Sequence, residues 1–235
     1  MKSELPLVQH RVLDSVRVQA QPHPFEMPIG ATALLVIDMQ NDFCALDGFC
    51  CGDMGLNASA VRAIIPALQK MTAWARKNEI PVFWTKEAHR RDLSDVSPSK
   101  KVRYENAGYP VGAIGKRGRY LVQGEWGARI IDELAPPEDE LQIDKPAQSA
   151  FPATALGTTL LERGVTHLLI SGVTTECCVL ATYRQANDLG FFALLLEDCC
   201  AAFEPREHQA AIDVVLSENG AVGWVSTSEH VLNAY

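Results

Sequence analysis

The sequence HLLISGVTTECCVLATYRQANDLG, residues 167–190, joins two elements with different patterns. Residues 167–173 are mostly apolar and predict a buried strand, whereas residues 178–190 predict a helix that ends at Gly190. Cys177 and Cys178 lie side by side at the junction. Adjacent cysteines are poor disulfide partners, so the pair raises the question of whether one of them is a nucleophile.

The same succession of strand and helix is found along most of the chain. Apolar runs predict strands at residues 33–37, 80–85, 140–145, 167–173, 191–198 and 221–226. Helical spacing predicts helices at residues 57–78, 128–134, 153–164, 178–190 and 206–220. We expect Pro66 to bend or split the helix at 57–78. The alternation indicates an α/β fold, a doubly wound, mostly parallel sheet with helices on both faces.

Domain organisation follows from composition along the chain. Residues 1–30, rich in proline and histidine, are interpreted as an N-terminal arm, and residues 31–235 as a single domain. Residues 86–127 are polar with weak periodicity. A stretch of this length inside an α/β domain favours an excursion over a functional site or an interface.

Composition argues against several classes of protein. The net charge is -8 without a long basic run, so we expect no nucleic-acid partner. No apolar run reaches the roughly 18 residues of a membrane helix, and the first residues lack the apolar core of a signal peptide. The seven cysteines have no zinc-binding spacing, and six of them form adjacent pairs. We therefore expect a cytoplasmic protein with reduced thiols.

Three reactive side chains follow predicted strands. Asp38, Lys145 and the pair Cys177 and Cys178 stand at strand ends, and the carboxyl ends of parallel strands meet at one edge of a sheet. Each residue taken singly also has a purely structural interpretation: the acid could cap a turn, the lysine could be a solvated strand end, and the thiols could fill the core. Together they predict a thiol-activating set, because an ammonium and a helix start favour a thiolate and a carboxylate accepts its proton.

Several spaced segments resemble the isochorismatase-like cysteine hydrolase superfamily over residues 31–228. They are LLVIDMQNDF, IDKPAQSAF, LISGVTTECCVLATYRQANDLGF and LLLEDCCAA. The resemblance implies a six-stranded parallel α/β fold, an Asp–Lys–Cys triad, cleavage of C–N bonds in small amides, and a homo-oligomer, either tetramer or dimer.

The resemblance also assigns roles to residues. Asp38 becomes the general base and acid, and Lys145 the cation that supports the thiolate. The pattern G-V-x-T-x-x-C-V selects Cys178 as the nucleophile and leaves Cys177 pointing away. A cis peptide bond is expected between Val173 and Thr174, with the amides of Thr174 and Cys178 forming the oxyanion hole.

Two branches of the superfamily fit the sequence less well. The isochorismatases proper lack the cysteine that this chain retains as Cys178. The nicotinamidases bind a metal through D-x-H-x-x-x-H, where this chain offers Glu87 and His89 but has Leu93 at the second histidine. We therefore expect no metal and no cofactor.

The greatest likeness is to the biuret, triuret and guanylurea hydrolases, which share the GVTT-x-x-CV motif. The resemblance places Phe43, Gln148 and Glu218 against the substrate, although Asn219 competes with Glu218 in the alignment. Gln148 replaces a lysine and Glu218 replaces a glutamine of the biuret enzymes, so the predicted pocket loses a cation and gains an anion. This favours the cationic substrate guanylurea over biuret or triuret.

The sequence thus predicts a cysteine amidohydrolase that releases ammonia from a urea-like amide through a covalent cysteine intermediate. The alternatives are a ureidoacrylate- or nicotinamide-type amidase, and a catalytically idle binding member of the fold.

Overall fold

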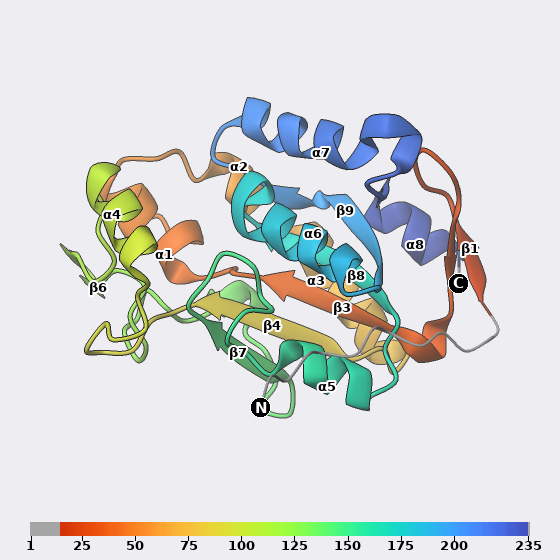
Figure 1. The fold of residues 1–235 in the computed structure, drawn as a ribbon, viewed down its shortest axis with the longest axis horizontal. Coiled ribbons are helices and arrows are strands. Elements are labelled where there is room, and N and C mark those ends of the chain that lie inside the picture. Colours follow the sequence, from red (N-terminus) through yellow and green to blue (C-terminus); the bar gives the residue numbers. More distant parts are fainter. Residues whose placement is uncertain (1–14, 235) are drawn as a thin grey trace.

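The computed structural model describes residues 15–234 and contains one six-stranded sheet (Figure 1). Its order is β10-β9-β8-β3-β4-β7, and every neighbouring pair is parallel. The strands are β3 (Thr32–Ile37), β4 (Val82–Glu87), β7 (Leu141–Lys145), β8 (His167–Val173), β9 (Phe192–Ala201) and β10 (Trp224–Ser226). The predicted doubly wound sheet is confirmed, and all six strands lie close to their predicted positions.

Helices join these strands. They are α1 (Asn41–Cys44), α2 (Ser59–Ala63), α3 (Ile65–Lys77), α4 (Pro98–Asn106), α5 (Leu156–Glu162), α6 (Leu180–Asp188), α7 (Pro205–Gly220) and α8 (Ser228–Ala234). Pro66 lies in the first turn of α3, so it splits the predicted helix into α2 and α3. The predicted helix at 128–134 is wrong, because only a 3₁₀ turn at Asp132–Leu134 forms there. The sequence patterns also missed α1, α4 and α8.

The central strands bury side chains on both faces, which explains their continuous apolar runs. Leu34 and Val36 point to the face covered by α2, α3 and α8. Leu35 and Ile37 point to the opposite face, where apolar side chains of α5, α6 and α7 pack. A hydrophobic core therefore packs on each face of the sheet, and this packing fixes the positions of the strand ends at its carboxyl edge.

The described part of the predicted N-terminal arm packs onto the domain. Strands β1 (Val16–Val18) and β2 (Phe25–Met27) form an antiparallel pair. The side chains of Val18, Phe25 and Met27 are buried in the core beside α3 and α8. Residues 1–14 of the predicted arm lie outside the described residues.

The polar stretch at residues 86–127 carries α4 and a short hairpin of β5 (Ile114–Gly115) and β6 (Gly118–Arg119). It has its own small core around Tyr120, which stacks on Phe49 with ring centroids 4.2 Å apart. Tyr104, Tyr109 and Tyr120 from this stretch line a cavity at the carboxyl edge of the sheet. The stretch is thus the predicted excursion over a site.

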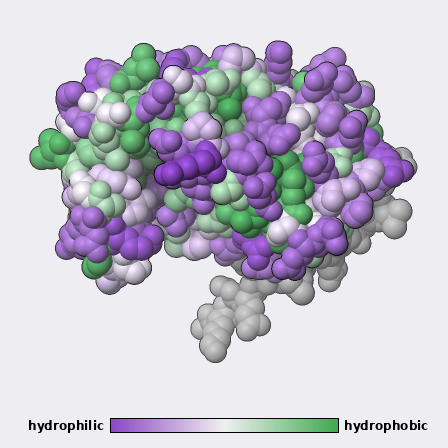
Figure 2. Space-filling model, turned by 90° about the horizontal axis from the view of Figure 1, so that it is seen from above, coloured by the Kyte–Doolittle hydropathy of each residue, from purple (hydrophilic) through white to green (hydrophobic). Residues whose placement is uncertain are grey.

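Polar side chains cover much of the face seen from above, interleaved with apolar patches (Figure 2). In the described part of the chain, the most exposed large apolar side chain is Ile114 of the hairpin, at 87%. Among residues 15–234, no helix combines the length and the apolar character that crossing a bilayer requires.

Candidate active site

The three predicted strand-end residues meet at the carboxyl edge of the sheet. Lys145 Nζ lies 2.8 Å from Asp38 Oδ2, and both side chains are fully buried. The Cys178 sulfur lies within 4.8 Å of a carboxylate oxygen of Asp38. The structure therefore assembles the predicted acid, amine and thiol in one cluster.

Local backbone geometry places the acid and the amine. Asp38 follows β3 in a left-handed conformation (φ 52°), and its carboxylate accepts a hydrogen bond of 2.7 Å from the Thr85 hydroxyl. Lys145 ends β7 and donates to the Ala147 carbonyl at 2.9 Å. Because Gly172 lacks a side chain, β8 approaches β3 closely: a Cβ there would lie 2.0 Å from the Ile37 carbonyl oxygen.

A single turn presents the cysteine pair. The peptide bond between Val173 and Thr174 is cis, as predicted. It leads into a π-helical turn at Thr175–Val179. The Thr174 carbonyl accepts from the amides of Cys177 and Val179, at 3.1 and 3.2 Å.

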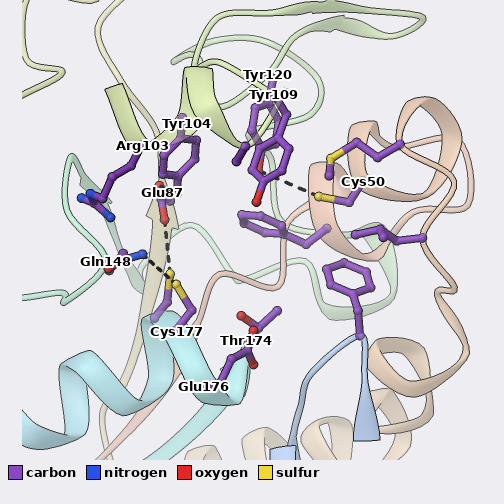
Figure 3. A pocket seen from close by; sticks show the side chains of 16 residues that line it. Cys50, Glu87, Arg103, Tyr104, Tyr109, Tyr120, Gln148, Thr174, Glu176 and Cys177 are labelled. Carbon is purple, nitrogen blue, oxygen red and sulfur yellow. Dashed lines mark hydrogen bonds between the residues drawn. The ribbon is translucent and has the colours of Figure 1, made fainter. Parts of the chain in front are cut away.

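The two cysteines make different contacts, although both line the cavity. Cys178 is buried, and its thiol donates to Glu87 Oε2 at 3.2 Å. Cys177 is partly exposed, and its sulfur accepts a hydrogen bond of 2.9 Å from Gln148 Nε2. The prediction that Cys177 points away is wrong, because the turn directs both thiols to the cavity. Of the two thiols, Cys178 contacts the buried carboxylate of Glu87, whereas Cys177 lies beside Gln148 (Figure 3).

A second carboxylate, Glu87, completes the cluster. It ends β4, next to the strand that leads to Asp38. Its Oε2 accepts from Cys178 and lies 3.6 Å from Lys145 Nζ. Sequence reasoning considered Glu87 only as a metal ligand, although its position at the end of a strand was a signal that it belonged to the site.

The buried charges set one another's protonation. Burial alone would raise the pKa of Glu87, but Lys145 and Lys100 hold it at about 2. Burial raises the pKa of Asp38, and the Lys145 ammonium opposes this. Burial alone would lower the pKa of Lys145, but the carboxylate of Asp38 and the other acidic groups around it keep this pKa above its ordinary value.

The resting thiol of Cys178 is neutral. Its contact with Cys177 and its burial raise its pKa, while Lys145 opposes the rise. A base must therefore take the thiol proton before Cys178 can attack a substrate. Asp38 has the higher proton affinity of the two carboxylates, and Glu87 holds the thiol in place.

Lysine ammonium groups stand where the acidic side chains converge. Asp38, Glu87 and Cys178 offer three possible ligand atoms within 4.8 Å of one another, but Lys145 already lies against both carboxylates. Glu87 and His89, the pair considered as metal ligands, share a second ammonium. The Nζ of Lys100 lies 2.5 Å from Glu87 Oε1 and 2.7 Å from His89 Nε2.

A cavity of about 270 Å³ opens above the thiols and fits a small substrate (Figure 3). One wall is aromatic, with Phe43, Tyr104, Tyr109 and Tyr120. The remaining lining residues are Cys50, Met54, Leu56, Glu87, Arg103, Ala107, Gln148, Thr174, Glu176, Cys177, Cys178 and Phe203.

The predicted substrate residues are placed differently by the structure. Phe43 and Gln148 line the cavity, but Glu218 does not. Helix α7 begins near the carboxyl edge of the sheet and runs back along it, away from the cavity. At 1.5 Å per residue, the end of the helix lies about 18 Å from its start. Glu218 and Asn219 are exposed there. The charge argument from Glu218 is therefore wrong for this cavity.

Two other charged residues line the cavity instead. Arg103 comes from α4, which the sequence patterns did not predict. Glu176 lies inside the TTECCV segment, from which the sequence patterns indicated only the two cysteines and Thr174 as site residues. Burial raises the pKa of Glu176, and among the described residues its buried Oε2 has no hydrogen-bond partner. Besides Glu87 of the buried cluster, the cavity thus offers one cation and one carboxyl group to a substrate.

Comparison with known proteins gives a consistent result. The family model of the isochorismatase domain matches residues 32–230. The ureidoacrylate amidohydrolase RutB of Acinetobacter baylyi is 28% identical over 224 residues, which are 93% of this chain and 89% of that protein. RutB of Azorhizobium caulinodans is 27% identical over 212 residues, 88% of this chain and 92% of its own. Both relatives are named as ureidoacrylate amidohydrolases, not as the biuret-type enzymes that the motifs resemble.

Solved structures agree with the fold. An isochorismatase family protein of Desulfovibrio vulgaris superposes with a TM-score of 0.70 at 26% identity, covering 86% of this chain and 97% of that one. The nicotinamidase of Bacillus subtilis gives a TM-score of 0.66 at 25% identity, covering 83% and 99%.

Proposed function

Since this chain belongs to the isochorismatase family, we propose that it is a cysteine amidohydrolase that cleaves a C–N bond of a small ureido compound and releases ammonia. The observation that carries this proposal is the Cys178 thiol, buried at the cavity floor among Asp38, Glu87 and Lys145. Amide hydrolysis by a thiol needs a nucleophile and a proton acceptor, and a nearby cation stabilises the thiolate; the cluster brings all three together.

In the first half-reaction Asp38 takes the thiol proton, and the Cys178 thiolate attacks the amide carbonyl carbon. The amides of Thr174 and Cys178 stabilise the oxyanion that forms. The C–N bond then breaks while Asp38 returns the proton to the leaving nitrogen, and ammonia departs. Lys145 compensates the negative charge throughout these steps.

In the second half-reaction water attacks the carbonyl carbon of the S-acyl intermediate, which is a thiocarbamate for a ureido substrate, with Asp38 as its base. The carbon–sulfur bond breaks, and the proton passes to the Cys178 sulfur. The acid product leaves and the resting thiol is restored.

The charged residues of the cavity support a choice of substrate. A ureido compound with a carboxylate, such as ureidoacrylate, would pair that group with Arg103. The similarity to ureidoacrylate amidohydrolases supports the same compound. Guanylurea is the second candidate, because its amidinium would pair with the carboxyl group of Glu176.

An ammonia-release screen tests the proposal. It compares ureidoacrylate, guanylurea, biuret, triuret and nicotinamide with the wild type and with Cys178→Ala. We expect turnover of at least one ureido compound by the wild type and none by the variant. A wild type inactive on every compound would contradict the proposed function and favour a binding role. The predicted homo-oligomer and the cytoplasmic location remain predictions, and light scattering measures the first.

A further inference from the structure

Lys100 carries a buried ammonium beside the reaction centre. The residue lies on α4 in the excursion and is only 3% exposed. Its Nζ lies 2.5 Å from Glu87 Oε1 and donates to His89 Nε2 at 2.7 Å and to the Pro146 carbonyl at 3.0 Å. All three donors of the ammonium are used in this way. Lysine is almost never buried unless it is paired, so this position needs an explanation.

The charge of Lys100 is directed at Glu87. His89 receives the lysine hydrogen at Nε2, so its own proton sits on Nδ1, facing Asp95 Oδ1 at 3.3 Å without an aligned hydrogen bond. Burial and the nearby ammonium lower the pKa of His89, which leaves the ring neutral. Glu87 is therefore the anion that balances Lys100.

The two oxygens of Glu87 have separate partners. Oε1 is held from α4 by Lys100 and by the Tyr104 hydroxyl, which donates at 3.0 Å. Oε2 is left to accept the Cys178 thiol. Because two contacts fix Oε1, the carboxylate cannot rotate without breaking them, and Oε2 stays aimed at the sulfur.

We propose that Lys100 is a positioning residue, which holds the Glu87 carboxylate toward the Cys178 thiol and couples α4 to the reaction centre. Lys100 is not among the residues that line the cavity, so it acts without touching the substrate. The inference rests on Cys178 being the nucleophile of the proposed function, but it is independent of which substrate is cleaved.

Removal of the Lys100 cation should raise the pKa of the Cys178 thiol. The groups around Glu87 are Lys100 and Tyr104 from α4, Lys145 from β7, Asp38 after β3, His89 after β4 and Cys178. Without Lys100 the cluster loses one positive charge, so a thiolate at Cys178 becomes less stable. The thiol pKa then rises and less thiolate forms at a given pH.

Lys100→Met tests the proposal, with Lys101→Met as the matched control. Lys101 is the next residue of the same helix, its side chain is 68% exposed, and its Nζ lies 4.0 Å from Glu105. The readouts are kcat, KM, and the pH dependence of the alkylation of Cys178 by iodoacetamide, followed by peptide mass spectrometry. For Lys100→Met we expect kcat and the alkylation rate at pH 7.5 to fall at least about 10-fold, with KM within about 3-fold. Lys101→Met should match the wild type.

Equal alkylation profiles in wild type and Lys100→Met, or an effect confined to KM, would overturn the proposal. Circular dichroism and thermal unfolding check the fold of each variant. If Lys100→Met unfolds, the double change Lys100→Met with Glu87→Gln decides: recovery of the fold supports the charge pairing, and failure to recover makes Lys100 a structural residue. An enzyme inactive on every ureido compound would refute the proposed function, while the alkylation comparison would still test Lys100.

Discussion

The Cys178 thiol donates a hydrogen bond to Oε2 of Glu87, with 3.2 Å between sulfur and oxygen. This contact distinguishes the two adjacent cysteines, since the Cys177 sulfur instead accepts from Gln148. The buried cluster therefore contains a thiol, two carboxylates and two ammonium groups. Its formal charge is balanced, which allows it to lie in the core of the protein.

Asp38→Asn should abolish most of the turnover without loss of the fold. The amide keeps the shape and the contact with Thr85, but it takes no proton from the thiol. General acid–base catalysis is typically worth about 10²–10⁴-fold, so kcat should fall at least about 100-fold. Asp144→Asn, next to Lys145 and partly exposed beside Lys86, is the matched control and should retain activity. A fully active Asp38→Asn enzyme would refute its role as the base.

The charge of the cavity should decide between substrates. Arg103→Met should reduce kcat/KM for ureidoacrylate about 10-fold or more, because its carboxylate loses a partner, and should spare guanylurea. Glu176→Gln should do the reverse. Glu218→Gln is the control, since this exposed residue lies away from the cavity. An effect of Glu218→Gln as large as that of Glu176→Gln would contradict the placement of the site.

Glu87 should make stability depend on pH at the acid end. Its pKa is held at about 2 in the folded protein, below the ordinary value of 4.5. The stabilisation that this shift brings is therefore present above pH 4.5 and is lost as the pH falls toward 2. The difference in unfolding free energy between wild type and Glu87→Gln should be about 2 kcal/mol smaller at pH 3 than at pH 7. Urea unfolding at both values measures it, and a difference independent of pH would show that Glu87 is not held ionised.

Gly172→Ala should destabilise the fold strongly. The residue has φ +111°, and an added Cβ would lie 2.0 Å from the Ile37 carbonyl oxygen and 2.5 Å from its nitrogen. The central strands must separate to admit it, and we expect a loss of more than about 3 kcal/mol. Gly30→Ala is the control, because nothing lies within 4 Å of its added Cβ. Similar melting temperatures for the two variants would contradict this reading of the strand contact.

Sequence patterns predicted the parts of the molecule that depend on local periodicity and on strand ends. The buried strands read as apolar runs, and Asp38, Lys145 and Cys178 follow them directly. The aromatic wall of the site was not predicted. Tyr104 and Tyr120 lie in a polar stretch without clear periodicity, and contacts with residues distant in sequence fix its structure. Resemblance alone placed Glu218 at the site, and the direction of α7 shows why it does not reach.

Trapping of the covalent intermediate shows directly whether Cys178 is the nucleophile. The wild type is mixed with its best ureido substrate, quenched in acid during turnover, and digested for mass spectrometry of the peptide that carries both cysteines. We predict an acyl adduct on Cys178, retained in Cys177→Ala and absent in Cys178→Ala. An adduct on Cys177, or steady ammonia release by Cys178→Ala, would contradict the account.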